Sequence, residues 1–211
     1  MLDLGAGEGS LARRLVDRVT GVDAVERSMA MITVGRSLPG GEAVTWYRDT
    51  AESFTAAGPF DLAVAGEAAH WFDLPVVVGR LWEVLRPSAP FVLVDRSSHH
   101  TRTPEVVEVI RKFSRAQDYD PAYDVAEELT ARRLWRRLGS FTPPECTFRQ
   151  SPRDYLASLR STSSLARALM TDADNDAFDA AVLDTVRPIT GRDGLLALEM
   201  TARLVWGAIT R

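Results

Sequence analysis

Short apolar runs alternate with longer amphipathic runs through the first half of the chain. The apolar, strand-like runs cover residues 1–5, 20–26, 43–48, 60–66 and 89–95. The helix-like runs lie between most of them, at residues 9–16, 28–37 and 73–86. This alternation is typical of a parallel β-sheet with helices on both faces. The sequence therefore predicts an α/β fold.

The second half of the chain has a different pattern. Residues 104–138 and 152–187 have the charged, amphipathic pattern of helical segments, and residues 145–150 between them are compatible with a strand. Residues 198–208 are apolar and partly β-branched, which predicts a terminal strand that lies antiparallel within the sheet. We predict a single domain over residues 1–211, built as a Rossmann-like, doubly wound, seven-stranded and mostly parallel sheet with helical cover segments.

The composition is that of an ordinary globular protein, and it limits the possible partners. Hydrophobic residues make up 45% of the 211 residues and charged residues 26%, with a formal net charge of -4. The acidic balance disfavours nucleic acid as a partner, and no apolar run reaches the length of a membrane span. Cys146 is the only cysteine, which excludes an internal disulfide and suits a reducing cytoplasm. The adjacent His99 and His100 lack the spacing of metal ligands on a helix, so we expect no metal site.

The most informative segment is Leu2-Asp3-Leu4-Gly5-Ala6-Gly7-Glu8-Gly9. An apolar strand enters three alternating glycines, and a helix-like run follows. Glycines permit a tight turn and the close approach of a ligand to the backbone, and the amides at a helix start favour an anionic group. The pattern predicts a nucleotide-like ligand at the carboxyl edge of the sheet. A strand–helix turn that binds nothing is the alternative.

Two classes of ligand use a loop of this kind. A dinucleotide-binding loop has its third glycine five residues after the first, and here that position is Ser10. The G-x-G-x-G spacing, with Asp3 two residues before Gly5, instead resembles the S-adenosylmethionine (SAM)-binding loop of class I methyltransferases. The resemblance implies that SAM is the cofactor and that the loop residues bind it, namely Asp3, Gly5, Ala6, Gly7 and Gly9.

A carboxylate at the end of the second strand is expected to accept hydrogen bonds from the ribose hydroxyls. Asp23 and Glu26 are the candidates, 18 and 21 residues after Gly5. The segment Glu26-Arg27-Ser28-Met29-Ala30-Met31 matches the family's acidic-x-Ser-x-x-Met pattern, whereas Asp23 is followed by Ala24-Val25-Glu26. We therefore predict that Glu26 binds the ribose, and the resemblance places Arg27 at the cofactor as well.

The segment Arg48-Asp49-Thr50-Ala51-Glu52 resembles the family's adenine-binding segment, which is usually Gly-Asp-Ala-Glu. The resemblance assigns Thr50, Ala51 and Glu52 to cofactor binding. Thr50 stands where an aspartate often occurs, and its hydroxyl accepts a hydrogen bond more weakly than a carboxylate does. Asp49 is the neighbour that can substitute for it.

The fourth predicted strand ends at Gly66-Glu67-Ala68-Ala69-His70-Trp71-Phe72-Asp73. An apolar strand followed by Ala-x-His-Trp-Phe-Asp is similar to the type 11, or trans-aconitate-like, group of small-molecule methyltransferases. Residues 85–90, 151–161 and 201–206 also resemble that group, so the resemblance covers nearly the whole chain. It implies a small-molecule methyl acceptor and places Gly66 at the cofactor.

In this family the fourth strand ends beside the methyl group, which makes Glu67 and His70 the catalytic candidates. SAM carries an activated methyl group, so the protein mainly has to hold the acceptor in line. A general base is needed only where the acceptor must lose a proton, and histidine titrates in the useful range. A packing role for His70 is the alternative. The segments 104–138 and 152–187 are expected to contact the acceptor.

Three classes of function are therefore compared. The first is a SAM-dependent methyltransferase of small molecules, and the second is a non-catalytic binding or scaffold protein of the same fold. The third is a nicotinamide-dependent enzyme, which Ser10 disfavours. In the resembling proteins a helical segment before the first strand helps to close the cofactor pocket, whereas this sequence opens directly on that strand. We expect upstream residues, on the order of 30–40, to complete the functional unit.

Overall fold

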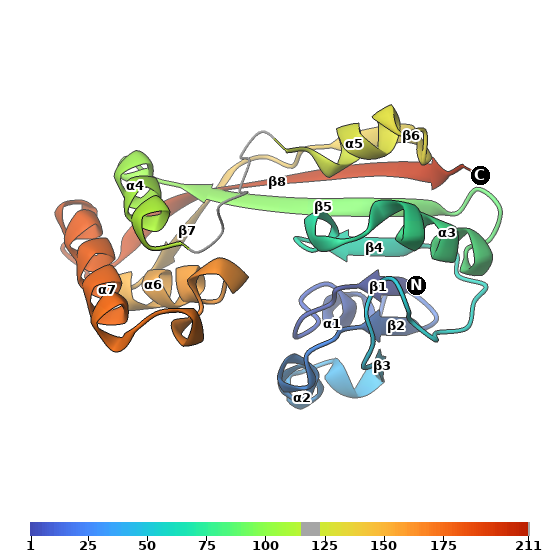
Figure 1. The fold of residues 1–211 in the computed structure, drawn as a ribbon, viewed down its shortest axis with the longest axis horizontal. Helices are drawn as coiled ribbons and strands as arrows, with labels where there is room; N and C mark the ends of the chain where they lie inside the picture. Colours follow the sequence, from blue (N-terminus) through green and yellow to red (C-terminus); the bar gives the residue numbers. More distant parts are fainter. Residues whose placement is uncertain (115–122, 211) are drawn as a thin grey trace. The chain divides into compact units, whose positions relative to one another are not determined.

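The computed structural model describes residues 1–114 and 123–210 (Figure 1). Eight strands form one mixed sheet in the order β3-β2-β1-β4-β5-β8-β6, and β7 pairs with β8 outside this path. The chain divides into two compact units. Unit 1 contains the described residues 1–96, 123–143 and 202–210, and unit 2 contains 97–114 and 144–201.

Five parallel strands form one side of the sheet, from its edge inward. They are β1 (Leu2–Leu4), β2 (Val22–Val25), β3 (Val44–Tyr47), β4 (Ala63–Gly66) and β5 (Pro90–His99). Strand β1 lies between β2 and β4, where Leu2 is paired with Asp23 on one side and Ala63 on the other. Leu2 and Leu4 are fully buried, as expected for a strand that is covered on both faces.

The terminal strand β8 (Leu196–Ile209) is antiparallel to its partners β6 (Trp135–Phe141) and β7 (Cys146–Gln150). The prediction of a mostly parallel, Rossmann-like sheet with an antiparallel last strand is thus confirmed. The prediction of a strand at 145–150 is confirmed too, since β7 occupies it. The sheet has eight strands rather than seven because β6 was not expected.

Strand β6 corrects the helical prediction for the end of segment 104–138. Residues 135–138 lie on this strand, which is interrupted by a register shift between Arg137 and Gly139. The Trp135 ring is buried 6.4 Å from the ring of Phe91, measured between centroids, while the next residues are exposed. Burial of this single tryptophan against the sheet outweighs the local helical pattern of charge.

The helices of unit 1 begin and end near the predicted residues, with one exception. Helix α2 (Met29–Ser37) is capped by Ser28, and α3 (Leu74–Val84) is capped by Asp73 and ends before Pro87. Helix α1 (Ala12–Leu15) is shorter than the predicted run 9–16. Three short elements complete the unit, namely the 3-10 turns η1 (Gly41–Ala43) and η2 (Ala69–Trp71) and helix α5 (Val125–Ala131).

Among the described residues, unit 2 contains three helices, the whole of β7 and one end each of β5 and β8. Helix α7 (Asp172–Val186) packs against both α4 (Thr103–Phe113) and α6 (Pro152–Arg160). The short turns η3 (Ser163–Leu165), η4 (Arg167–Leu169) and η5 (Arg187–Ile189) connect or extend these helices. At the centre, the Arg160 guanidinium lies 4.4 Å above the Phe178 ring and forms a 2.6 Å ion pair with Asp179. No helix among the described residues is long and apolar enough to cross a membrane.

Candidate functional site

The loop after β1 has the conformation that its glycines predicted. Gly5, Gly7 and Gly9 have φ values of 68°, 59° and 80°, which residues other than glycine rarely adopt. A Cβ atom on Gly5 would lie 2.5 Å from the Cβ of Ala68, so this position requires a glycine. A Cβ atom on Gly7 would meet no atom within 4 Å, so the backbone there faces open space that a ligand can approach.

Glu26 lies directly after β2 and contacts this loop. Its Oε2 accepts a 2.9 Å hydrogen bond from the Gly7 N–H, and its Oε1 accepts a 2.7 Å bond from the Ser28 N–H. The contact arises because β1 and β2 are parallel neighbours whose carboxyl ends meet at one edge of the sheet. Arg27 is exposed beside it. The structure therefore brings together the glycine loop and the acidic residue that the sequence singled out.

Asp23 lies three residues before Glu26, within β2. Its carboxylate accepts a 3.2 Å hydrogen bond from the hydroxyl of Tyr47 on the neighbouring strand. Asp23 therefore has a partner inside the sheet, whereas Glu26 lies at the edge where the loop opens.

Asp3 is the buried acid of the site, with 1% of its surface exposed. Its Oδ2 accepts a 3.1 Å hydrogen bond from the Ala12 N–H at the start of α1. Burial, together with the negative charges of Glu26 and Glu8, raises the pKa of Asp3 to about 7, although the hydrogen bond from the Ala12 N–H acts in the opposite direction. Asp3 thus holds the glycine loop against α1 from beneath.

The segment after β3 continues the same edge of the sheet. The Asp49 N–H donates to the backbone carbonyl of Glu26 at 3.3 Å. The Asp49 Oδ1 accepts hydrogen bonds from the Thr50 N–H and the Ser53 hydroxyl, and the Thr50 hydroxyl lies 3.0 Å from that of Ser53. Ala51 is buried, and Glu52 Oε1 accepts a 3.0 Å bond from the Asp73 N–H.

Glu67 and His70 follow Gly66 at the end of β4. Glu67 has a φ of 55°, and its carboxylate accepts a hydrogen bond from the N–H of Arg96 on the neighbouring strand β5. Partial burial raises the pKa of Glu67 and lowers that of His70, and the nearby Asp95 carboxylate acts on His70 in the opposite direction. The His70 and Trp71 rings lie 5.0 Å apart, and Trp71 is 66% exposed.

Three charged residues of this edge were missed by the sequence analysis. They are Asp95 after the buried part of β5, Asp124 before α5 and Arg203 on β8. Arg203 Nη2 lies 2.7 Å from Asp124 Oδ2 and 3.6 Å from Asp95 Oδ2. The sequence offers a signal for Asp95, because it follows the apolar residues 90–94 as Glu67 follows an apolar strand. It offers none for Asp124 and Arg203, which are distant in the sequence and approach Asp95 only in the folded chain.

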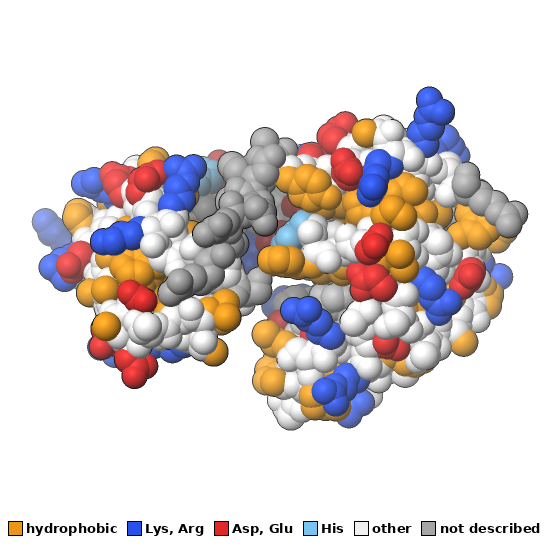
Figure 2. All heavy atoms as spheres, in the orientation of Figure 1, with side chains coloured by type: hydrophobic (Ala, Val, Ile, Leu, Met, Phe, Trp, Pro, Cys, Tyr) orange, Lys and Arg blue, Asp and Glu red, His pale blue; other side chains and the backbone are white. Residues whose placement is uncertain are grey.

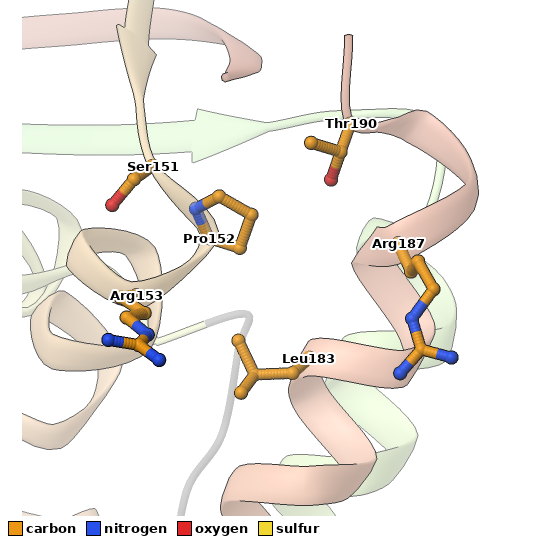
Figure 3. Close-up of a pocket in the computed structure, with 6 residues that line it drawn as sticks. All are labelled: Ser151, Pro152, Arg153, Leu183, Arg187 and Thr190. Atoms are coloured by element: carbon orange, nitrogen blue, oxygen red, sulfur yellow. The ribbon is translucent and has the colours of Figure 1, made fainter. Parts of the chain in front are cut away.

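Unit 2 contains a separate pocket of about 400 Å³ (Figure 3). Its lining residues are Ser151, Pro152, Arg153, Leu183, Arg187 and Thr190, four of which lie in segment 152–187. The Ser151 hydroxyl is already bonded to Asp154, and Arg187 is paired with Asp184. Among the described residues, no group of three or more His, Cys, Asp or Glu side chains could hold a metal ion.

Acidic and basic side chains are interspersed on the face of the molecule drawn in Figure 2.

Comparison with known proteins finds a family model that is similar to the first part of the chain. Residues 1–88 match the family model described as a methyltransferase domain. No curated protein sequence matches the chain significantly. A proposed type II methyltransferase from Anaeromyxobacter dehalogenans has a similar structure, with 26% identity, a TM-score of 0.63 and coverage of 98% of this chain and 87% of that one.

Two further structures share the fold at 16% identity. Geranyl diphosphate methyltransferase, solved in complex with SAM, has a TM-score of 0.54 and is matched over 99% of this chain and 77% of its own. The [4+2]-cyclase SpnF has a TM-score of 0.57, with coverage of 99% and 74%. The match over residues 1–88 and the 26% identical structure support a methyltransferase domain in the first part of the chain, and the two structures at 16% identity show the fold alone.

Proposed function

We propose that this protein transfers a methyl group from SAM to a small-molecule acceptor, as a member of the type 11, trans-aconitate-like group. The observation that carries the proposal is the contact between Gly7 and Glu26, which unites a loop open to a ligand with a carboxylate at the same edge of the sheet. SAM needs both features. Its ribose hydroxyls donate to a carboxylate, and its anionic carboxylate group is favoured near backbone amides.

The residues present fit SAM. Glu26 uses two of the roughly four acceptor positions of a carboxylate for backbone N–H groups, which leaves acceptor capacity for ribose hydroxyls. In the proposal, the open backbone at Gly7 lets the cofactor approach, and Gly5, Ala6, Gly9 and Gly66 lie beside it at the same edge of the sheet. Arg27, Thr50, Ala51 and Glu52 flank it, and the buried Asp3 supports the loop. When bound, SAM supplies a methyl group that is already activated by the sulfonium charge.

The roles of this chain are then to orient the acceptor and to manage its proton. His70 is proposed to take a proton from an acceptor O–H or N–H group, because it lies beyond the end of β4 and its lowered pKa keeps the imidazole neutral near pH 7. Glu67, tied to the backbone of Arg96, fixes the loop that carries His70.

A non-catalytic SAM-binding protein is the second candidate. The Thr50 hydroxyl, which stands where an aspartate often occurs, is engaged with Ser53, so it is a weaker partner for the adenine.

Calorimetry with SAM, its demethylated product and NAD tests the assignment. We expect SAM and its demethylated product to bind and NAD not to bind. The matched variant Glu26→Gln should bind SAM more weakly than the wild-type protein does. Binding of NAD in place of SAM would overturn the proposal. Incubation with methyl-labelled SAM and a panel of small acceptors follows, and binding without transfer to any of them would favour the second candidate.

A further inference from the structure

The pocket of unit 2 has no part in the methyl transfer proposed above. It lies where the start of α6 meets the end of α7 and the segment after it, and its volume is about 400 Å³ (Figure 3). Pockets that bind small molecules have volumes of roughly 300–1,000 Å³, so this one suits a ligand at the small end of that range. All six lining residues belong to unit 2, whereas the glycine loop and Glu26 belong to unit 1.

Two half-buried apolar side chains form walls of the pocket. Pro152 is the first residue of α6, and Leu183 lies in the last turn of α7. Figure 3 shows both side chains projecting into the space between the two helices. The helices pack against each other, and Leu183 also contacts the apolar core of unit 2, so the fold fixes these walls. They offer contact area to an apolar group.

Two arginines give the pocket its charge, and none of its lining residues is acidic. Arg153 on α6 and Arg187 on η5 lie on opposite sides of it (Figure 3). Arg153 is exposed, and within residues 1–114 and 123–210 its guanidinium has no carboxylate partner. Arg187 is paired with Asp184, and both side chains are mostly exposed. Exposed ion pairs contribute little to stability, so the Arg187 guanidinium can turn to a ligand at small cost.

The two hydroxyl groups of the pocket already donate their protons within the chain. The Ser151 hydroxyl donates to Asp154 Oδ2 at 2.7 Å, and the Thr190 hydroxyl donates to the Val186 carbonyl at 3.1 Å. The guanidinium groups are therefore the side-chain donors that remain for a ligand. Guanidinium groups bind carboxylates and phosphates through charge-assisted hydrogen bonds.

We propose that this pocket binds a small organic anion. Arg153 and Arg187 hold its carboxylate or phosphate group, and its apolar part contacts Pro152 and Leu183. A neutral molecule of the same length lacks the first interaction, and an inorganic anion lacks the second. The proposal does not depend on methyl transfer, because no residue of the cofactor edge takes part in it.

Calorimetry on the whole chain with hexanoate and hexyl phosphate tests the proposal. We expect the better of the two to bind with a Kd on the order of 1 mM, and its head group then identifies the class of anion. Hexanol and inorganic phosphate should bind at least tenfold more weakly. In amide nuclear magnetic resonance spectra, the bound anion should shift the signals of the lining residues. Binding of neither organic anion, or equal binding of hexanol, would overturn the proposal, and equal binding of inorganic phosphate would indicate an adventitious anion only.

Two single substitutions test the role of the charges. Arg153→Gln and Arg187→Gln should each raise the Kd by about three- to tenfold. Both side chains are exposed, so the variants should fold, and circular dichroism checks this. Arg192→Gln is the matched control, since it removes an exposed arginine of unit 2 that does not line the pocket, and it should leave the Kd unchanged. An unchanged Kd in both pocket variants, or an equal loss in the control, would show that the anion binds elsewhere.

Discussion

The backbone N–H of Gly7 donates a 2.9 Å hydrogen bond to the carboxylate of Glu26, 19 residues further along the chain. The two residues meet because each follows one of two adjacent parallel strands, β1 and β2. Gly7 presents its amide to the carboxylate with a φ of 59°, a value that favours glycine. The loop and the acid therefore form one structural unit, and a change in either residue is expected to affect cofactor binding.

Replacing Glu26 by alanine should weaken SAM binding. The variant loses the proposed acceptor of the ribose hydroxyls and also the partner of the Gly7 N–H. Hydrogen bonds to charged groups contribute about 1.5–3 kcal/mol, which corresponds to a rise in Kd of roughly 10- to 150-fold. Isothermal titration calorimetry measures the change. Asp23→Asn is the comparison, and it should leave the Kd within about twofold because Asp23 is bonded to Tyr47 inside the sheet. The reverse pattern would show that Asp23 is the ribose acceptor.

Replacing His70 by alanine should slow methyl transfer and leave SAM affinity unchanged. General acid–base catalysis contributes about 10²- to 10⁴-fold, so the single-turnover rate should fall by that factor. Trp71→Ala is a useful comparison, because Trp71 is the exposed ring beside His70 and carries no titratable group. A His70→Ala protein with an unchanged rate and a lower melting temperature would assign His70 to packing.

The cofactor edge was predictable from the sequence because its determinants are local. Ser28 and Asp73 cap the helices that begin at the next residue, and the glycine spacing prescribes the turn after β1. The choice of Glu26 over Asp23 depended on the residues that follow each of them. The structure brings Glu26 into contact with the loop, and its role in binding the ribose stays a prediction.

The charged groups around His70 were not predictable in this way. Asp95, Asp124 and Arg203 are separated by tens of residues, and they meet only because β8 returns antiparallel to the sheet. Strand β6 was missed for a related reason. Its arginines have the pattern of a helix end, and the burial of Trp135 that selects the strand depends on Phe91, far away in the chain.

Unit 2 should lose stability as the pH falls below neutrality, and His100 should contribute to this loss. Its Nδ1 accepts a 3.0 Å hydrogen bond from the Arg102 N–H, so the neutral ring carries its proton on Nε2, which lies 3.1 Å from the Tyr155 hydroxyl. Protonation of Nδ1 breaks the first bond. Burial lowers the pKa of His100 in the folded protein below the usual 6.5, so the unfolded chain binds protons first. The stabilisation is therefore full above about pH 6.5 and decreases below it.

Urea unfolding between pH 5 and pH 7.5 measures this effect. His100→Gln should lose about 1–3 kcal/mol at pH 7.5, the value of two hydrogen bonds, and should show a weaker dependence on pH than the wild-type protein. His99→Gln is the control, since His99 is exposed and paired with Glu145. An equal pH dependence in wild-type and His100→Gln proteins would contradict the prediction.

Asp3 should have the opposite dependence on pH, and Asp3→Asn should reveal it. The carboxyl of Asp3 has a pKa of about 7 in the folded protein and 3.8 as its ordinary value, so the folded state holds the proton more tightly. Stability from this group is complete below pH 3.8 and is lost as the pH rises to about 7. Asparagine stays neutral and can still accept the Ala12 N–H. The free energy of unfolding of the variant relative to wild type should therefore increase by roughly 2.5 kcal/mol when the pH is raised from 5 to 8. Urea unfolding at both pH values measures this gain, and Asp17→Asn, which removes an exposed carboxylate, should retain the wild-type dependence. A gain that is the same at pH 5 and pH 8 would show that Asp3 is ionised in the folded protein throughout this range.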